Sequence, residues 1–167
     1  MKKFLHIYLI SISFTLISCG IYSFSGASIS NEVKNITINT FQNISSLAPP
    51  TLSNSLTEGL KDKFLSETRL SPIDNDGDLM FNGQITNYTI NPIAIQANET
   101  ASKNRLTISI KVNFINNIDE ESNYNKTFSR YVDYESSINF TSIEESLNEE
   151  IVSQLIEDIF NEAFTNW

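Results

Sequence analysis

Hydrophobic and polar residues alternate along four stretches of this chain, as they do in β-strands that bury one face and expose the other. The clearest stretch is 106–114, where leucine, isoleucine, valine and phenylalanine occupy every second position and polar residues lie between them. The other three stretches are 33–41, 79–90 and 124–134. The alternation in 79–90 changes phase before Tyr88, which predicts a β-bulge. We therefore expect four strands, of which the last two form a hairpin.

Two other stretches carry apolar residues at every fourth position, which is the spacing of an amphipathic helix. The first stretch is 51–68, and its apolar positions are Leu52, Leu56, Leu60 and Phe64. The second stretch begins near Thr141, and its apolar stripe continues to Ala163. Thr141 and Glu144 have the spacing of a capping box, so we expect them to cap the start of this helix.

The order strand, helix, three strands, helix indicates an α+β fold. Its simplest form is a four-stranded mixed β-sheet with both α-helices packed on one face. The opposite face of the sheet is then polar and uncovered, so it is available to a partner or an amphiphile. We assign this single domain to residues 32–167.

The acidic segment 74–78 (DNDGD) has carboxylates at alternate positions, as the first half of a calcium-binding loop does. The remainder of the loop does not fit. Its sixth position is Leu79, where glycine is needed, and its twelfth is Ile85, where a bidentate glutamate is needed. We therefore predict a solvated turn in which Gly77 adopts a positive φ angle.

The N-terminal segment has the composition of a signal peptide, because two lysines precede an apolar run that is too short to span a membrane. Residues 16–19 (LISC) resemble the lipobox of bacterial lipoproteins. We expect a signal peptide at 1–18, a lipid attached to Cys19 and a tether at 19–31. The resemblance implies, from Gly20 after the cysteine, an outer-membrane location that faces the periplasm. The alternative is an ordinary secretory leader whose apolar run ends in a cysteine.

Two absences restrict the possible chemistry. His6 is the only histidine and lies in the expected leader, and Cys19 is the only cysteine. The mature chain therefore has no imidazole and no free thiol, which excludes serine–histidine and cysteine–histidine catalysis, zinc sites of these ligands, and disulfides. We expect no metal, no cofactor and no catalytic residue. A hydrolase that uses carboxylates alone is the remaining enzymatic alternative, with Glu99, Asp133 and Glu135 as its candidates.

The net charge argues against nucleic acid as a partner. The formal charge of the whole chain is −9, from 11 basic and 20 acidic residues. Loss of the two leader lysines leaves 9 basic residues, and 9 minus 20 is −11. Such a charge repels phosphates, so an anionic partner must be bound by a local basic patch.

Most of the mature chain resembles the LptE family of lipopolysaccharide-assembly lipoproteins. The stretches that carry the resemblance are 19–29, 50–70, 77–90, 97–114 and 150–167. The most specific of them is 97–114, ANETASKNRLTISIKVNF. The resemblance implies a non-enzymatic protein with two helices on a four-stranded sheet. It also implies that the chain is the plug of the β-barrel LptD and assists the delivery of lipopolysaccharide to the outer leaflet.

Three basic residues are candidates for contact with the phosphates of lipopolysaccharide: Lys103, Arg105 and Lys111. The alternative for each is a solvated side chain on the sheet, which is the usual situation of exposed lysine and arginine. A second functional alternative is a lipid-anchored periplasmic adaptor for another outer-membrane channel or secretion machine. This adaptor would have the same anchor and the same open sheet, so only the identity of the partner distinguishes it.

Overall fold

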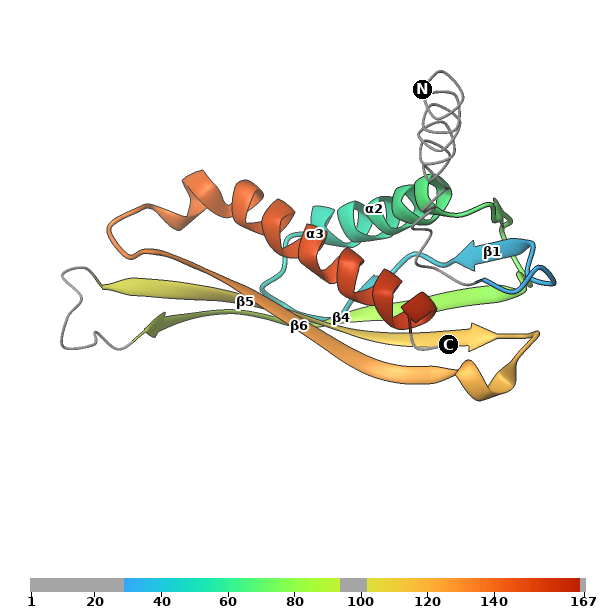
Figure 1. The fold of residues 1–167 in the computed structure, drawn as a ribbon. Helices are drawn as coiled ribbons and strands as arrows, with labels where there is room; N and C mark the ends of the chain where they lie inside the picture. Colours follow the sequence, from blue (N-terminus) through green and yellow to red (C-terminus); the bar gives the residue numbers. More distant parts are fainter. Residues whose placement is uncertain (1–28, 94–101, 166–167) are drawn as a thin grey trace, which may run out of the picture.

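Residues 29–93 and 102–165 are described by the computed structural model, and they form a β-sheet layer and a layer of two α-helices (Figure 1). The elements in chain order are β1 (Asn35–Ile38), β2 (Gln42–Asn43), α2 (Thr51–Glu67), β3 (Ser71–Pro72), β4 (Leu79–Ile93), β5 (Lys103–Asn116), the 3-10 helix η2 (Glu120–Ser122), β6 (Tyr124–Glu135) and α3 (Phe140–Thr165). The predicted α+β fold, in the order β-α-β-β-β-α, is confirmed. The sequence does not predict β2 and β3, because two residues are too few to show an alternation.

The sheet is mixed because its first strands are parallel and its last strands are antiparallel. The described residues form six strands, in the order β3-β1-β4-β5-β6, with β2 also beside β4. β1 and β4 are parallel, with Ile36 opposite Leu79, and α2 supplies the crossover that a parallel pair requires. β4, β5 and β6 are antiparallel neighbours, which confirms the hairpin expected from the last two alternating stretches.

The predicted bulge in β4 is present. The ladder with β5 pairs Ile85 with Ile110 and then Asn87 with Ser109, so Thr86 is left out of the register. One extra residue reverses the side of the strand to which the next residues point. The buried Tyr88 therefore lies on the same face as Ile85, although the two residues are three positions apart.

The apolar stripes of the helices and strands form one core between the two layers. The apolar positions buried on β5 are Leu106, Ile108, Ile110, Val112 and Phe114; those on α2 are Leu52, Leu56, Leu60 and Phe64; those on α3 include Leu147, Ile151, Leu155, Ile159 and Ala163. Figure 1 shows both helices on the same side of the sheet. The predicted placement of the helices on one face is therefore confirmed.

Phe64 lies at the centre of this core. Its ring centroid is 4.9 Å from that of Phe81 on β4, 5.1 Å from that of Phe160 and 5.3 Å from that of Phe164 on α3. Tilted and edge-on ring pairs at such distances are favourable beyond the area that they bury. Phe64 therefore connects α2 to the sheet and to the second helix.

Asn139, and not Thr141, accepts the first hydrogen bonds at the start of α3. The backbone N–H of Thr141 donates to Asn139 Oδ1 at 3.0 Å. The predicted capping box is therefore wrong, because the helix begins at Phe140 and Thr141 already lies in its first turn. Glu144 has another partner, since Tyr88 Oη donates to its Oε1 at 2.9 Å.

The turn at 74–78 lies between β3 and β4 in the chain and is hydrogen-bonded to the start of β1. The side chain of Asp78 accepts hydrogen bonds from the backbone N–H groups of Lys34 and Asn35, at 2.8 and 3.1 Å. The residue with a positive φ angle is Asp76, at 56°, so the prediction of a positive φ at Gly77 is wrong. Gly77 is required for a different reason, because a Cβ there would lie 2.7 Å from the backbone nitrogen of Thr37.

We expect the substitution Phe64→Ala to destabilise the fold by about 3–5 kcal/mol, because it leaves a cavity where three other rings meet. Urea unfolding followed by circular dichroism measures this change. The neighbouring Leu65 is 45% exposed, so Leu65→Ala is the matched control. The control should change the stability by less than about 1 kcal/mol, and similar losses in both variants would contradict the central position of Phe64.

Candidate functional site

The face of the sheet opposite the helices is not covered by any described element (Figure 1). Alternate residues of β4, β5 and β6 point to this face. The residues between them point to the helices, and on β4 and β5 most of these are buried in the core. The neutral polar residues on it are Asn82, Gln84, Asn87, Thr89 and Asn91 from β4, Thr107, Ser109 and Asn113 from β5, and Asn125, Thr127 and Ser129 from β6. We call this surface the open face.

Side-chain hydrogen bonds join neighbouring strands across the open face. Asn39 Nδ2 donates to Asn82 Oδ1 at 2.8 Å, and the hydroxyl groups of Ser109 and Ser129 lie 3.0 Å apart. Each side-chain amide has two donor hydrogens and an acceptor oxygen, so one such bond leaves hydrogen-bonding capacity for a ligand. The open face therefore presents neutral donors and acceptors, which suit sugar hydroxyls or another polar protein surface.

Lys111 lies in a depression of the open face of about 570 Å³. The residues that line this depression are Asn39, Thr40, Gln42, Asn82, Gly83, Gln84, Lys111, Asn113 and Asn125. The side chain of Lys111 is exposed, and the described residues provide no ion pair for it. A solvated ammonium group surrounded by amides can bind a phosphate while the amides bind neighbouring hydroxyls.

Arg105 is already engaged by its neighbours. Its Nε and Nη2 atoms donate to the two carboxylate oxygens of Asp133 at 2.7 and 2.9 Å, and its guanidinium lies 3.6 Å from the ring centroid of Tyr131. These donors hold the pKa of the Asp133 carboxyl below its usual range, although partial burial acts in the opposite direction. The bidentate pair therefore uses the Nε–Nη2 edge of the guanidinium and neutralises its charge, which weakens its attraction for a phosphate.

The three candidate cations do not form one patch. Lys103 lies opposite Glu135 in the ladder, beside the Arg105–Asp133 pair, and its charge also lowers the pKa of Asp133. Lys111 is six residues beyond Arg105 on the same strand, which is roughly 20 Å at the rise of a β-strand. The structure thus places Lys103 and Arg105 together and Lys111 in a separate depression.

The candidates for a carboxylate hydrolase are not brought together among the described residues. Asp133 is held by Arg105, and its lowered pKa is the opposite of what a general acid requires. Glu135 is exposed at the end of β6, and Glu99 lies outside the described residues. In the described ranges, no group of three histidine, cysteine, aspartate or glutamate residues is placed to hold a metal ion.

The amides around Lys111 are the part of this site that the sequence does not reveal. They come from β4 and β5, from the start of β6, from β2, and from the segment that precedes β2. The alternation of apolar and polar residues in β4 does predict that Asn82 and Gln84 lie on its polar face. Nothing in the sequence indicates that Asn39 and Gln42 lie beside them, because β2 has only two residues.

The acidic residues are concentrated on the helix layer. Helix α3 contains seven carboxylates and no lysine or arginine. The open face carries Lys103, Arg105 and Lys111 against Asp133 and Glu135. The local charge of the open face therefore differs from the negative charge of the whole chain, and it repels an anionic ligand less than the helix layer does.

Helices capable of crossing a membrane are not found in the part of the chain that the structure describes. The anchor expected at Cys19, the signal peptide at 1–18 and most of the tether lie outside the described residues.

The sequence matches a family model over residues 33–163, which is most of the chain. That family is LptE, described as lipopolysaccharide-assembly. No curated protein is matched by the sequence.

Solved structures share the architecture. The hypothetical protein CT253 from Chlamydia trachomatis has a TM-score of 0.53 at 10% identity, with 80% of this chain and 98% of that chain covered. A minor lipoprotein from Acinetobacter baumannii has a TM-score of 0.48 at 14% identity, with 79% and 94% covered. At 10% identity, the similarity to CT253 concerns the fold alone.

We expect Arg105→Gln to raise the pKa of Asp133 toward that of a free aspartate, which a carbon-13 NMR titration of the carboxyl group measures. Because the folded-state pKa is lowered, the ion pair stabilises the fold above the ordinary aspartate pKa, and this contribution is lost as the pH falls through the folded-state value. The variant and the wild type should therefore differ at neutral pH and converge in acid. Lys111→Gln is the control, and an equal rise of the Asp133 pKa in it would refute the specific pairing.

Proposed function

Because this chain belongs to the LptE lipopolysaccharide-assembly family, we propose that it acts as the lipoprotein partner and plug of an LptD-type outer-membrane β-barrel. Members of this family assist lipopolysaccharide assembly at the outer membrane and are not enzymes. The observation that carries the proposal is the family match over 33–163, which includes all the strands described above, α2, and α3 except its last two residues.

Lipid on Cys19 anchors the chain in this proposal. Residues 1–18 are removed as a signal peptide, 19–31 form the tether, and 32–167 form the domain on the periplasmic side of the outer membrane. The lipobox-like sequence at 16–19 supports this arrangement. Acyl chains contribute about 0.8 kcal/mol per buried methylene, so several chains hold a protein at a membrane without a spanning helix.

The open face is the surface that we assign to lipopolysaccharide and to the polar interior of the barrel. Lys111 contacts a phosphate of lipopolysaccharide, and amides of the surrounding depression contact sugar hydroxyls. Lys103 and Arg105 contribute less in this proposal. The charge of Arg105 is already balanced by Asp133, and the same carboxylate lies near Lys103.

The adaptor alternative is distinguished by the partner. An adaptor for an efflux channel or a secretion pore would have the same anchor and the same open face. The neutral polar character of that face does not separate the two functions, so the choice rests on the family match.

A tag after Trp167 and purification from outer membranes in mild detergent test the proposal. We expect a β-barrel of the LptD type to co-purify in stoichiometric amount, as mass spectrometry would show. Cys19→Ala removes the thiol that accepts the lipid, so this control should lose the barrel and fail to reach the outer membrane. A different channel, or a membrane-bound chain without any partner, would overturn the LptD assignment in favour of the adaptor.

We expect Lys111→Gln to weaken the retention of purified lipopolysaccharide on the immobilised protein about fivefold, which corresponds to ~1 kcal/mol for an exposed charged contact. Lys61→Gln is the control, because Lys61 is a partly exposed lysine on α2 that pairs with Glu58. Both variants should unfold at the wild-type temperature. Equal retention by the two variants would remove Lys111 from the site.

A further inference from the structure

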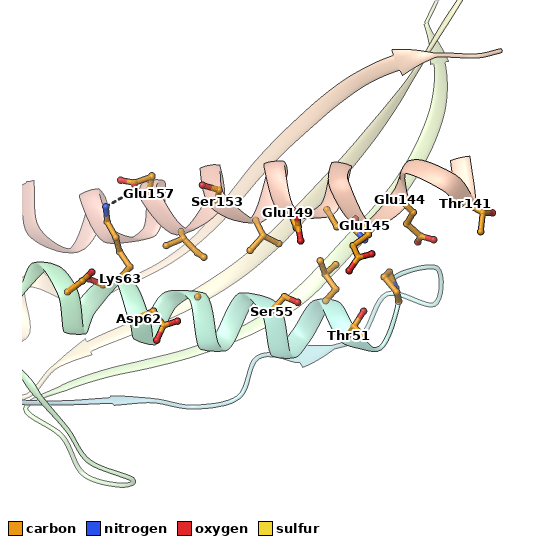
Figure 2. Close-up of a pocket in the computed structure, with 17 residues that line it drawn as sticks. Thr51, Ser55, Asp62, Lys63, Thr141, Glu144, Glu145, Glu149, Ser153 and Glu157 are labelled. Atoms are coloured by element: carbon orange, nitrogen blue, oxygen red, sulfur yellow. Dashed lines mark hydrogen bonds and ion pairs between the residues drawn. The ribbon is translucent and has the colours of Figure 1, made fainter. Parts of the chain in front are cut away.

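A groove of about 840 Å³ separates the outer edges of α2 and α3 (Figure 2). The two helices run in the same direction, so Thr51 and Thr141 lie at one end of the groove and Lys63 and Glu157 lie toward the other. The lining extends over 141–157 of α3, which is roughly 24 Å at the rise of an α-helix. This length corresponds to about four helical turns.

The floor of the groove is apolar, and small residues line the side that α2 forms. Leu52, Val152 and Ile156 form the floor. Gly59 allows the helices to approach closely, because a Cβ there would lie 2.6 Å from Ile156 Cδ1. Ser55 stands one turn before Gly59 on the same wall. Small side chains at these positions let another helix backbone come near the floor.

The rim of the groove is negatively charged. Five carboxylates and one ammonium group line it. Lys63 is bound to Glu157 at 2.6 Å, and this hydrogen bond is the main reason why the pKa of Lys63 is raised. Glu144 accepts the hydrogen bond of the Tyr88 hydroxyl. The charge of this rim is therefore only partly balanced within the protein.

Three carboxylates remain for a ligand: Asp62, Glu145 and Glu149. They are exposed, and the described residues give them neither an ion pair nor a hydrogen bond. Glu145 and Glu149 are one turn apart on α3, and Asp62 lies on the other helix (Figure 2). They are too dispersed to converge on one metal ion, in agreement with the lack of any metal cluster in the described ranges. Their spacing suits a ligand that carries several positive charges along its length.

We propose that this groove binds a basic amphipathic helix of a partner protein. Its apolar side packs on Leu52, Val152 and Ile156, and lysine or arginine on its flanks pairs with the three free carboxylates. The acidic rim repels phosphate groups, so the occupant differs from the ligand assigned to the open face. The inference is therefore independent of the proposed function, and its failure would leave that function untouched.

The probe for this site is a fluorescein-labelled 18-residue helical peptide with leucine and alanine along one side and lysine on the flanks. Its binding to the full chain in nonionic detergent is followed by fluorescence anisotropy. The triple variant Asp62→Asn, Glu145→Gln, Glu149→Gln should weaken binding at least about tenfold, because three charge pairs are lost. The same peptide with glutamate in place of lysine should not bind.

A matched triple variant separates the groove from the general charge of the chain. Asp74→Asn, Glu120→Gln and Glu121→Gln remove the same number of charges from exposed positions outside both α-helices and outside the groove. This control should weaken binding less than about threefold, as expected for distant, screened charges. Equal effects of the two triple variants would mean that only long-range attraction is present, and the proposal would be overturned.

A tryptophan substitution tests the shape of the groove without a change of charge. Ser55→Trp fills the groove and should abolish peptide binding, whereas the adjacent Asn54→Trp, outside the lining, should not. Thermal unfolding should be the same for both variants. Undiminished binding by Ser55→Trp would refute the proposal. So would a wild-type dimer that this variant dissociates in sedimentation, because a second copy of the chain would then be the occupant.

Discussion

The contact of Phe64 with Phe81, Phe160 and Phe164 holds the two layers of the molecule together, and both proposed binding surfaces depend on it. The apolar residues of the helices and of β4 and β5 are buried in the layer around these rings. The opposite side of the sheet and the outer side of the helices are therefore left to polar residues. Burial of apolar area at roughly 25 cal/mol per Å² is the driving force for this division.

The two polar sides differ in their chemistry. The open face presents amides, hydroxyls and the exposed Lys111, whereas the helix side presents most of the carboxylates. A single net charge conceals this difference. The family assists lipopolysaccharide assembly at the outer membrane. The separation of charges is compatible with the two ligands that we propose, an anionic glycolipid on the open face and a basic helix in the groove.

The sequence is informative wherever a regular period continues over several residues. The alternation in β5, the fourfold spacing in α2 and the phase change before Tyr88 each predict what the structure contains. Helix caps and turn glycines depend on contacts with other segments, and the spacing of apolar residues does not predict such contacts. Asn139 caps α3 because the helix begins two residues earlier than a cap at Thr141 would place it, and Gly77 is required by its closeness to Thr37.

The candidate site is harder to predict because it depends on the pairing of strands. Arg105 and Asp133 face each other only through the register of β5 and β6, and that register engages Arg105 while leaving Lys111 exposed. The inter-helix groove depends on how α2 and α3 lie side by side, which neither helix specifies alone. Amphipathic spacing indicates which side of a helix is buried, but it does not indicate which second helix lies beside it.

Strand β6 lies at the edge of the sheet and has twelve residues, which is long for an edge. Lys126 and Arg130 on this strand form ion pairs with Glu162 and Asp158 on α3, at 2.6 and 2.5 Å. Charged side chains on an edge strand disfavour the addition of a strand from another molecule. A second copy that added here would bring its own lysine and arginine against the same pair. The charges along β6 therefore disfavour strand-to-strand aggregation at this edge of the sheet, while the same side chains hold α3 against it.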